Sequence, residues 1–197
     1  MYEDGVEHYL EAKKKAARKV LGRQIKHLPS NGEISEALHN LARFQHGDSH
    51  NRTLFEMRLL AMEVMEQLDA FMPRLIGSVS TGKIRRGSDI DLHIFTDSLE
   101  TIHVRLETLD WQYETRQILI QKSGRPMEFT HIYLDFEYPV ELSIYPLNEI
   151  RIRGRSSTDG KPIIRLSVAK VRELIMSEHG DAWEAYLAED SEPLLAT

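Results

Sequence analysis

Residues 76–92 read IGSVSTGKIRRGSDIDL, and the end of this stretch is the strongest indication of the fold. Asp89 and Asp91 stand one residue apart there, at the start of a segment that alternates polar and apolar residues as far as Phe95. Successive side chains of a β-strand point to opposite faces, so both aspartates should share one face, about 6.6 Å apart. Two carboxylates at that spacing can together bind a hard, oxygen-seeking cation such as Mg²⁺.

Gly77 and Ser78 precede the aspartates at the end of a short apolar segment. Glycine lets the backbone turn tightly, and the N–H groups and hydroxyl that follow can approach a phosphate closely, helped by the N-terminus of a following helix. A phosphate cradle beside a metal-binding carboxylate pair predicts a site that moves phosphoryl or nucleotidyl groups. A surface Asp-Ile-Asp alone would predict no metal site, so the prediction depends on the combination.

The same stretch matches most of a P-loop, because Gly77, Gly82 and Lys83 have the spacing of that motif. Two features exclude it. Ile84 stands where a P-loop has the Ser or Thr that ligates Mg²⁺. Gly87 also interrupts the helix that the motif should open.

The stretch resembles the signature of the nucleotidyltransferase superfamily, the fold of DNA polymerase β and the aminoglycoside nucleotidyltransferases. That signature is Gly-Ser, a spacer and Asp-x-Asp between hydrophobic residues, and Gly82 and Ser88 match its small, minimal members. The resemblance spans residues 73–146 and implies an α+β fold with a mixed β-sheet flanked by helices, which the mixture of strand and helix patterns also favours. The residues that we expect to bind the nucleotide are Gly77, Ser78, Lys83 and Ser88.

The resemblance also implies a third carboxylate on a later strand. Glu141 and Asp135 both fit, since each stands between apolar residues. We favour Glu141, because residues 139–146 look more like the strand of the family, and Asp135 stays the alternative. Asp89, Asp91 and Glu141 would then be the catalytic residues and the ligands of Mg²⁺ or Mn²⁺, with Glu141 also a candidate base for the acceptor hydroxyl.

Basic residues follow the Gly-Ser pair. Lys83, Arg85 and Arg86 are near enough in sequence to neutralise pyrophosphate, although a solvated loop explains them equally well. His93 shares the predicted face of the aspartates, where it either lines the site or is a strand histidine with its own partner.

Composition limits the other functions. The chain has 197 residues, no cysteine and a net charge of −6, which argues against disulfides, thiol catalysis and general nucleic-acid binding. No membrane-spanning stretch or signal peptide is apparent, so we expect a cytoplasmic protein with no membrane partner.

The N-terminal region reads as helical. We divide the chain into a helical segment over residues 1–72, packed on the core, and a nucleotidyltransferase domain over residues 73–197. The segment is expected to cover the sheet, but an acceptor-binding role or a homodimer interface stays open. The helices predicted in it span 6–23, 30–46 (ended by Gly47) and 54–71. The later predicted elements are strands at 74–76, 89–95, 112–122, 128–136 and 140–145, and helices starting near 98 and at 167.

The expected function is an enzyme that transfers a nucleoside monophosphate from an NTP, with ATP as first choice, to a hydroxyl and releases pyrophosphate. A small molecule or a protein side chain is the favoured acceptor, since the chain has no room for the added domains of template polymerases. An RNA end comes next because of basic runs at 13–26 and 151–172. The alternative is a non-catalytic, nucleotide-binding regulatory or antitoxin-like protein of the same fold, which would not need three carboxylates.

Overall fold

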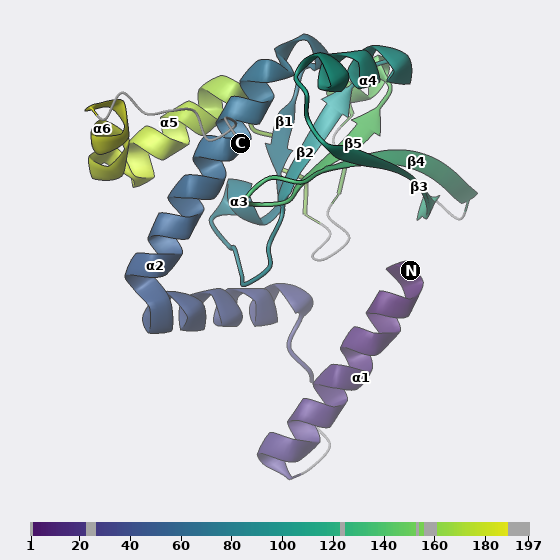
Figure 1. Cartoon of the computed structure of the whole chain (residues 1–197). Coiled ribbons are helices and arrows are strands. Elements are labelled where there is room, and N and C mark those ends of the chain that lie inside the picture. Colours follow the sequence, from purple (N-terminus) through teal and green to yellow (C-terminus); the bar gives the residue numbers. More distant parts are fainter. Residues whose placement is uncertain (1, 23–26, 123–124, 153, 156–160, 189–197) are drawn as a thin grey trace.

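The protein is described by a computed structural model that covers residues 2–22, 27–122, 125–152, 154–155 and 161–188. Five strands form one mixed sheet in the order β1-β2-β5-β4-β3, in which β2 and β5 are parallel and the other neighbours antiparallel (Figure 1). The strands are β1 Arg74–Ile76, β2 Ile90–Phe95, β3 Tyr113–Lys122, β4 Arg125–Leu134 and β5 Val140–Tyr145. The predicted fold class, α+β with a mixed sheet flanked by helices, is confirmed.

The strand predictions agree closely with the structure in β1 and β5 and less well in the hairpin. Strand β2 begins at Ile90, so Asp89 lies just before the strand and not within it. Strand β4 begins at Arg125, three residues earlier than predicted, because the β3–β4 pair continues in register to its tip. Ser123 and Gly124 lie outside the described residues.

Helices flank the sheet. They are α1 Tyr2–Leu21, α2 Asn31–Gln67, α3 Gly77–Thr81, α4 Leu99–Thr108, α5 Val168–Glu178 and α6 Gly180–Ala188, with short 3₁₀ turns η1 Asp69–Phe71 and η2 Leu147–Arg151. Figure 1 shows α1 and the start of α2 extending away from the sheet. No helix in the described ranges combines the length and apolar character that a membrane-spanning segment requires. The division at residues 72 and 73 stays a prediction.

The prediction that Gly47 ends a helix is wrong, because α2 continues through it. A glycine ends a helix when it adopts the left-handed conformation, and Gly47 is not among the glycines with positive φ. A helical glycine costs only about 1 kcal/mol, and the helix on its C-terminal side is stabilised by burial. The helix begins as predicted, with the Ser30 hydroxyl accepting from the Glu33 amide at 3.1 Å.

The C-terminal half of α2 forms the centre of the core. It packs against α5 and α3, while α4 and the inner face of the sheet complete the cluster. Nearly every residue from Leu54 to Leu68 is buried, so this half of the helix is enclosed on more than one face. Strands β1, β2, β4 and β5 contribute inward-facing residues to it, including Leu75, Leu92, Ile132 and Leu142. The intervening side chains of β2, β4 and β5 therefore point to the opposite face.

Candidate metal centre and nucleotide-binding turn

Three carboxylates meet on the sheet face opposite the core. Asp91 of β2 lies directly across the parallel pairing from Glu141 of β5, and Asp89 precedes β2 by one residue. Carboxylate oxygens of all three residues lie within 4.8 Å of one another. The parallel register of β2 and β5 therefore joins two acids that are fifty residues apart in sequence.

Asp135 lies apart from this group. It is exposed and follows the end of β4 at Leu134, and the residue of β4 opposite Glu141 is Tyr133. The carboxylates grouped within the described residues are those of Asp89, Asp91 and Glu141, without Asp135. Of the two candidates for the third carboxylate, the structure places only Glu141 beside the aspartates.

The two facing carboxylates have opposite pKa shifts. Burial and, to a smaller extent, the nearby charges of Asp89 and Glu141 together raise the pKa of Asp91 to about 7. His131 lowers the pKa of Glu141, because its Nδ1 lies 2.7 Å from Glu141 Oε1. This effect outweighs burial, which alone would raise the pKa. The hydroxyl of Ser143 also donates to that oxygen at 3.3 Å. In the metal-free protein Glu141 is thus ionised at neutral pH, while Asp91 is partly protonated.

These residues fit a hard divalent cation. All three donors are carboxylates, which suit Mg²⁺ and Mn²⁺ better than the softer metals that prefer nitrogen and sulfur. The raised pKa of Asp91 means that its ionised form is unfavourable without a counter-charge, first because it is buried and then because Asp89 and Glu141 lie near it. A divalent cation would remove that penalty by neutralising the cluster.

Gly77 begins α3 and lies against Asp91. Its φ is +72°, a conformation that favours glycine, and a Cβ added there would lie 2.1 Å from Asp91 Oδ2. Both the backbone conformation and the space at this position therefore require glycine. The hydroxyls of Ser80 and Thr81 both donate to the Gly77 carbonyl, at 2.8 Å and 3.1 Å. Gly82 ends the turn with φ +72°.

Ser78 lies in the first turn of α3 and is half-buried. Ser78 directly follows Gly77, the residue that lies against Asp91. Its carbonyl is the acceptor for the amides of Gly82 and Lys83, which fixes the backbone of the turn.

The predicted role of Ser88 is less direct. Its hydroxyl accepts from the Arg85 amide at 2.8 Å, and its own amide donates to the Arg85 carbonyl at 3.0 Å. Ser88 thus closes the turn that directly precedes Asp89. Lys83, Arg85 and Arg86 are exposed, and nucleotide binding by Lys83 and Ser88 stays a prediction.

His93 is a strand histidine with its own partner. It is 3% exposed, and Arg165 Nε donates to His93 Nδ1 at 3.0 Å. Burial, followed by the charge of Arg165, lowers the pKa of His93 to about 3, so the ring is neutral. The Arg165 guanidinium lies over the ring of Phe95 at 5.0 Å and that of Tyr145 at 5.9 Å, which closes this part of the face.

Sequence reasoning missed His131 and Tyr133. Both lie on β4 and face β5 in register with Ser143 and Glu141. Their place depends on the pairing of β4 with β5, which no local sequence signal specifies. The alternation of polar and apolar residues in β4 was the only available indication that they point away from the core.

No protein-family model and no curated protein sequence matches this chain. Two solved structures are similar to part of it. One is of Cid1, described for its RNA terminal uridylyl transferase activity, with 13% identity over 57% of this chain and 36% of that chain, at a TM-score of 0.29. The other is of the GLD-2/RNP-8 complex, with 16% identity over 52% of this chain and 49% of that chain, at a TM-score of 0.26. The chain thus spans less than half of either, and similarity at this level does not establish a shared family.

Proposed function

We propose that the protein is a metal-dependent nucleotidyltransferase, which transfers a nucleoside monophosphate from an NTP to a hydroxyl and releases pyrophosphate. The observation that carries the proposal is the contact of the glycine turn with the acidic cluster, where Gly77 has room for no side chain because Asp91 occupies that space. A carboxylate cluster alone is common on protein surfaces. A cluster in contact with a Gly-Ser turn is expected where a metal-bound phosphate must be held.

Each residue of the site has a separate role in the proposed reaction. Asp89, Asp91 and Glu141 would hold Mg²⁺ or Mn²⁺, which when bound neutralises phosphate charge and lowers the pKa of a coordinated hydroxyl. Ser78 would orient the terminal phosphates of the NTP. We assign Glu141 as the proton acceptor for the attacking hydroxyl, as the resemblance of residues 139–146 to the third carboxylate strand of the family implies.

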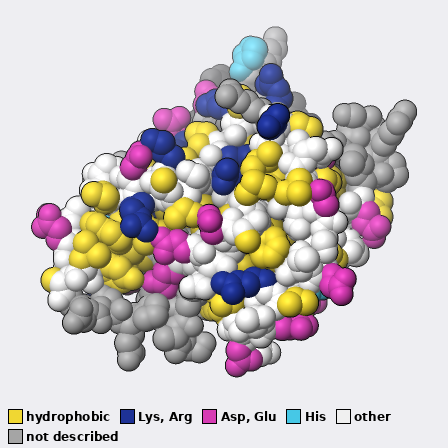
Figure 2. All heavy atoms as spheres, turned by 90° about the horizontal axis from the view of Figure 1, so that it is seen from above, with side chains coloured by type: hydrophobic (Ala, Val, Ile, Leu, Met, Phe, Trp, Pro, Cys, Tyr) yellow, Lys and Arg dark blue, Asp and Glu magenta, His cyan; other side chains and the backbone are white. Residues whose placement is uncertain are grey.

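A small molecule or a protein side chain is the favoured acceptor. RNA binding is dominated by contacts to phosphates and calls for a continuous basic surface. Figure 2 shows one face of the molecule, on which Lys and Arg side chains are interspersed with Asp and Glu and do not gather in one patch. The net charge of −6 agrees with that preference. ATP as the NTP, a cytoplasmic location and a homodimer stay predictions.

Thermal denaturation with each NTP tests the proposal without knowledge of the acceptor. An NTP with Mg²⁺ or Mn²⁺ should raise the melting temperature by several degrees, since a ligand at a hundred times its Kd stabilises the fold by about 2.7 kcal/mol. Metal alone should do less, and an NTP with chelator little. A shift that persists in chelator would instead favour the non-catalytic nucleotide binder. If no NTP shifts the melting temperature, the proposal is wrong.

Turnover is then tested with labelled NTPs. The protein is incubated with each NTP, Mg²⁺ and small hydroxyl compounds, protein substrates or short RNAs. The expected result is labelled acceptor together with pyrophosphate. Label on RNA alone would move the acceptor to nucleic acid.

A further inference from the structure

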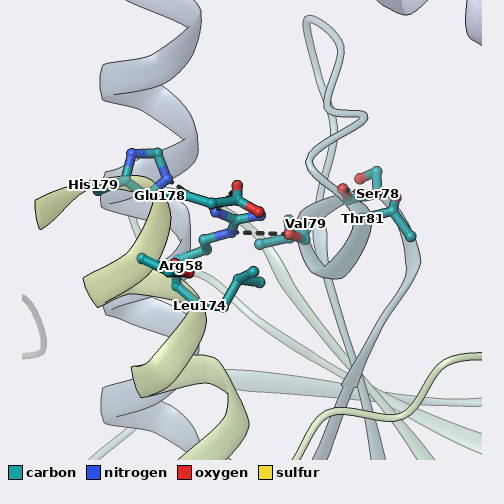
Figure 3. Close-up of polar contacts among 8 residues, drawn as sticks. Arg58, Ser78, Val79, Thr81, Leu174, Glu178 and His179 are labelled. Atoms are coloured by element: carbon teal, nitrogen blue, oxygen red, sulfur yellow. Dashed lines mark hydrogen bonds and ion pairs between the residues drawn. The ribbon is translucent and has the colours of Figure 1, made fainter.

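Arg58 is a charged residue in the middle of the core. It lies in the C-terminal half of α2, and only 1% of it is exposed. Figure 3 shows its guanidinium between α3 on one side and the end of α5 on the other. A buried charge is costly unless partners satisfy it, so the residues around it require an explanation.

Three partners surround the guanidinium. Its Nε donates to the Val79 carbonyl at 3.2 Å, and its Nη1 lies 2.8 Å from Glu178 Oε2. The same Nη1 lies 2.9 Å from His179 Nε2. A guanidinium only donates hydrogen bonds, so His179 accepts through Nε2 and carries its own proton on Nδ1. Burial, and then the charge of Arg58, lowers the pKa of His179, which agrees with a neutral ring.

The contact with Val79 stabilises the end of α3. That helix has five residues, and the last four carbonyls of any helix have no partner within it. Arg58 supplies a donor to one of them, and its positive charge lies at the negative end of the helix dipole. Its Nη2 also lies beside Gly82, which ends α3, at 3.5 Å from where a Cβ would stand. A planar fork can satisfy the carbonyl and the α5 residues at once, whereas a lysine could not.

The position of α3 matters at its other end. Gly77, its first residue, is in contact with the Asp91 carboxylate, and Ser78 follows it. A displacement of so short a helix would therefore shift Ser78, which follows the point of contact with the acidic cluster. The path from Glu178 to Asp91 consists of one ion pair, one hydrogen bond and one helical turn.

We propose that Arg58 is a positioning residue for the nucleotide-binding turn, and that Glu178 and His179, where α5 meets α6, hold Arg58 in place. The C-terminal helices thereby set the affinity for NTP through a side chain that touches neither nucleotide nor metal. The effect on nucleotide rests on the proposed function. The effect on the turn does not, and it is measured separately.

The test uses Glu178→Ala in the full chain, with Glu173→Ala as the matched control. Both glutamates are on α5, and their side chains are half or more exposed, at 50% and 63%, so both variants should fold. Glu173 pairs with Lys170 and has no contact with Arg58 among those described. Arg58→Lys provides a second variant, which keeps the charge and loses the fork. The measurements are amide hydrogen exchange at Gly82 and Lys83, Mn²⁺ affinity, and the Kd for NTP with Mg²⁺.

Glu178→Ala should speed exchange of the Gly82 and Lys83 amides by at least about tenfold, the scale of one lost charged hydrogen bond. It should raise the Kd for NTP by about as much and change Mn²⁺ affinity less than twofold. Glu173→Ala should change none of these, and Arg58→Lys, which removes the fork itself, should change them at least as much as Glu178→Ala. If Glu178 had a purely structural role, Glu178→Ala would lower the melting temperature. Amide exchange at Gly82 and Lys83 and the Kd for NTP would then be the same as in the control. Unchanged exchange at Gly82 and Lys83 overturns the inference. Failure of the wild type to bind any NTP overturns the proposed function and the predicted effect on affinity, while the exchange result still decides the link to the turn.

Discussion

The acidic cluster and the α3 turn meet at Gly77, yet they are held in place by different kinds of interaction. Asp91 and Glu141 are aligned by backbone pairing between β2 and β5. The turn is held by side chains, including its own hydroxyls and Arg58, which come from several parts of the sequence. A sheet places its residues rigidly, whereas a short turn depends on each contact around it. The cluster should therefore tolerate distant changes that the turn does not.

Removing the carboxylates should have the largest effect. Turnover should fall by at least about 100-fold in each of the variants Asp89→Ala, Asp91→Ala and Glu141→Gln. Mutating a residue that only hydrogen-bonds to a metal ligand already lowers metal affinity or activity by about 10- to 100-fold. The backbone pairing that aligns the cluster does not involve these side chains, so the fold should stay intact. Steady-state rates with labelled NTP measure the first effect, and circular dichroism the second.

Asp135→Asn is the matched control, because Asp135 is exposed beyond the end of β4. It should change turnover less than about twofold, as surface substitutions usually do. A larger loss with Asp135→Asn than with Glu141→Gln would move the third ligand to Asp135. That outcome would also contradict the idea that strand register selects the ligands.

Gly77→Ala should have the next largest effect, because it disturbs the point where the two regions meet. The change combines a strained backbone with a clash against Asp91, and should destabilise the protein by about 3–4 kcal/mol. Gly87→Ala is the comparison, since Gly87 also has a positive φ but nothing lies within 4 Å of an added Cβ. It should cost only about 1–2 kcal/mol. Urea denaturation measures both, and equal losses would show that the contact with Asp91 has no importance.

The smallest effect concerns pH and the charge of the cluster alone. The pKa of Asp91 rises from its usual 3.8 to about 7, so between those values the native state binds more protons than the unfolded state. Stability of the metal-free protein should therefore fall as pH rises through this window. Glu141 has a lowered pKa, and its contribution is lost only at lower pH.

Asp91→Asn should flatten this dependence. Denaturation at pH 5, 6, 7 and 8 in chelator measures it, with Asp135→Asn again as control. An unchanged slope in Asp91→Asn would mean that burial and repulsion do not act on this carboxylate as described. Excess Mg²⁺ should also flatten the curve in the wild type if the cluster binds the ion.

The sheet and its acids were predictable because their signals are local. Strand alternation located β1, β2 and β5, and the spacing of Asp89 and Asp91 gave two of the clustered carboxylates. Glu141 could be predicted only from the family resemblance, because nothing near it in sequence indicates that β5 pairs with β2 and places it beside Asp91. The structure supplies the reason for Gly77, which no property of an isolated glycine could reveal.

The support of the turn was not predictable. Arg58 stands within an apolar stretch whose period indicates core packing, and its partners lie 21 and 120 positions away in the sequence. The continuation of α2 through Gly47 was missed for a related reason, because helix ends depend on tertiary packing as well as on local residues. Interactions between side chains distant in sequence are set by the fold and have no periodic signal.

The parallel pairing of β2 and β5 has a consequence for how the protein acquires its site. A slip of one residue would turn Glu141 toward the core and bring Val140 or Leu142 to the site face, because strand side chains alternate. Such a molecule would bury a charge and lack a metal ligand at once. The fraction of a refolded preparation that binds Mn²⁺ would therefore measure how many molecules have joined these two strands correctly.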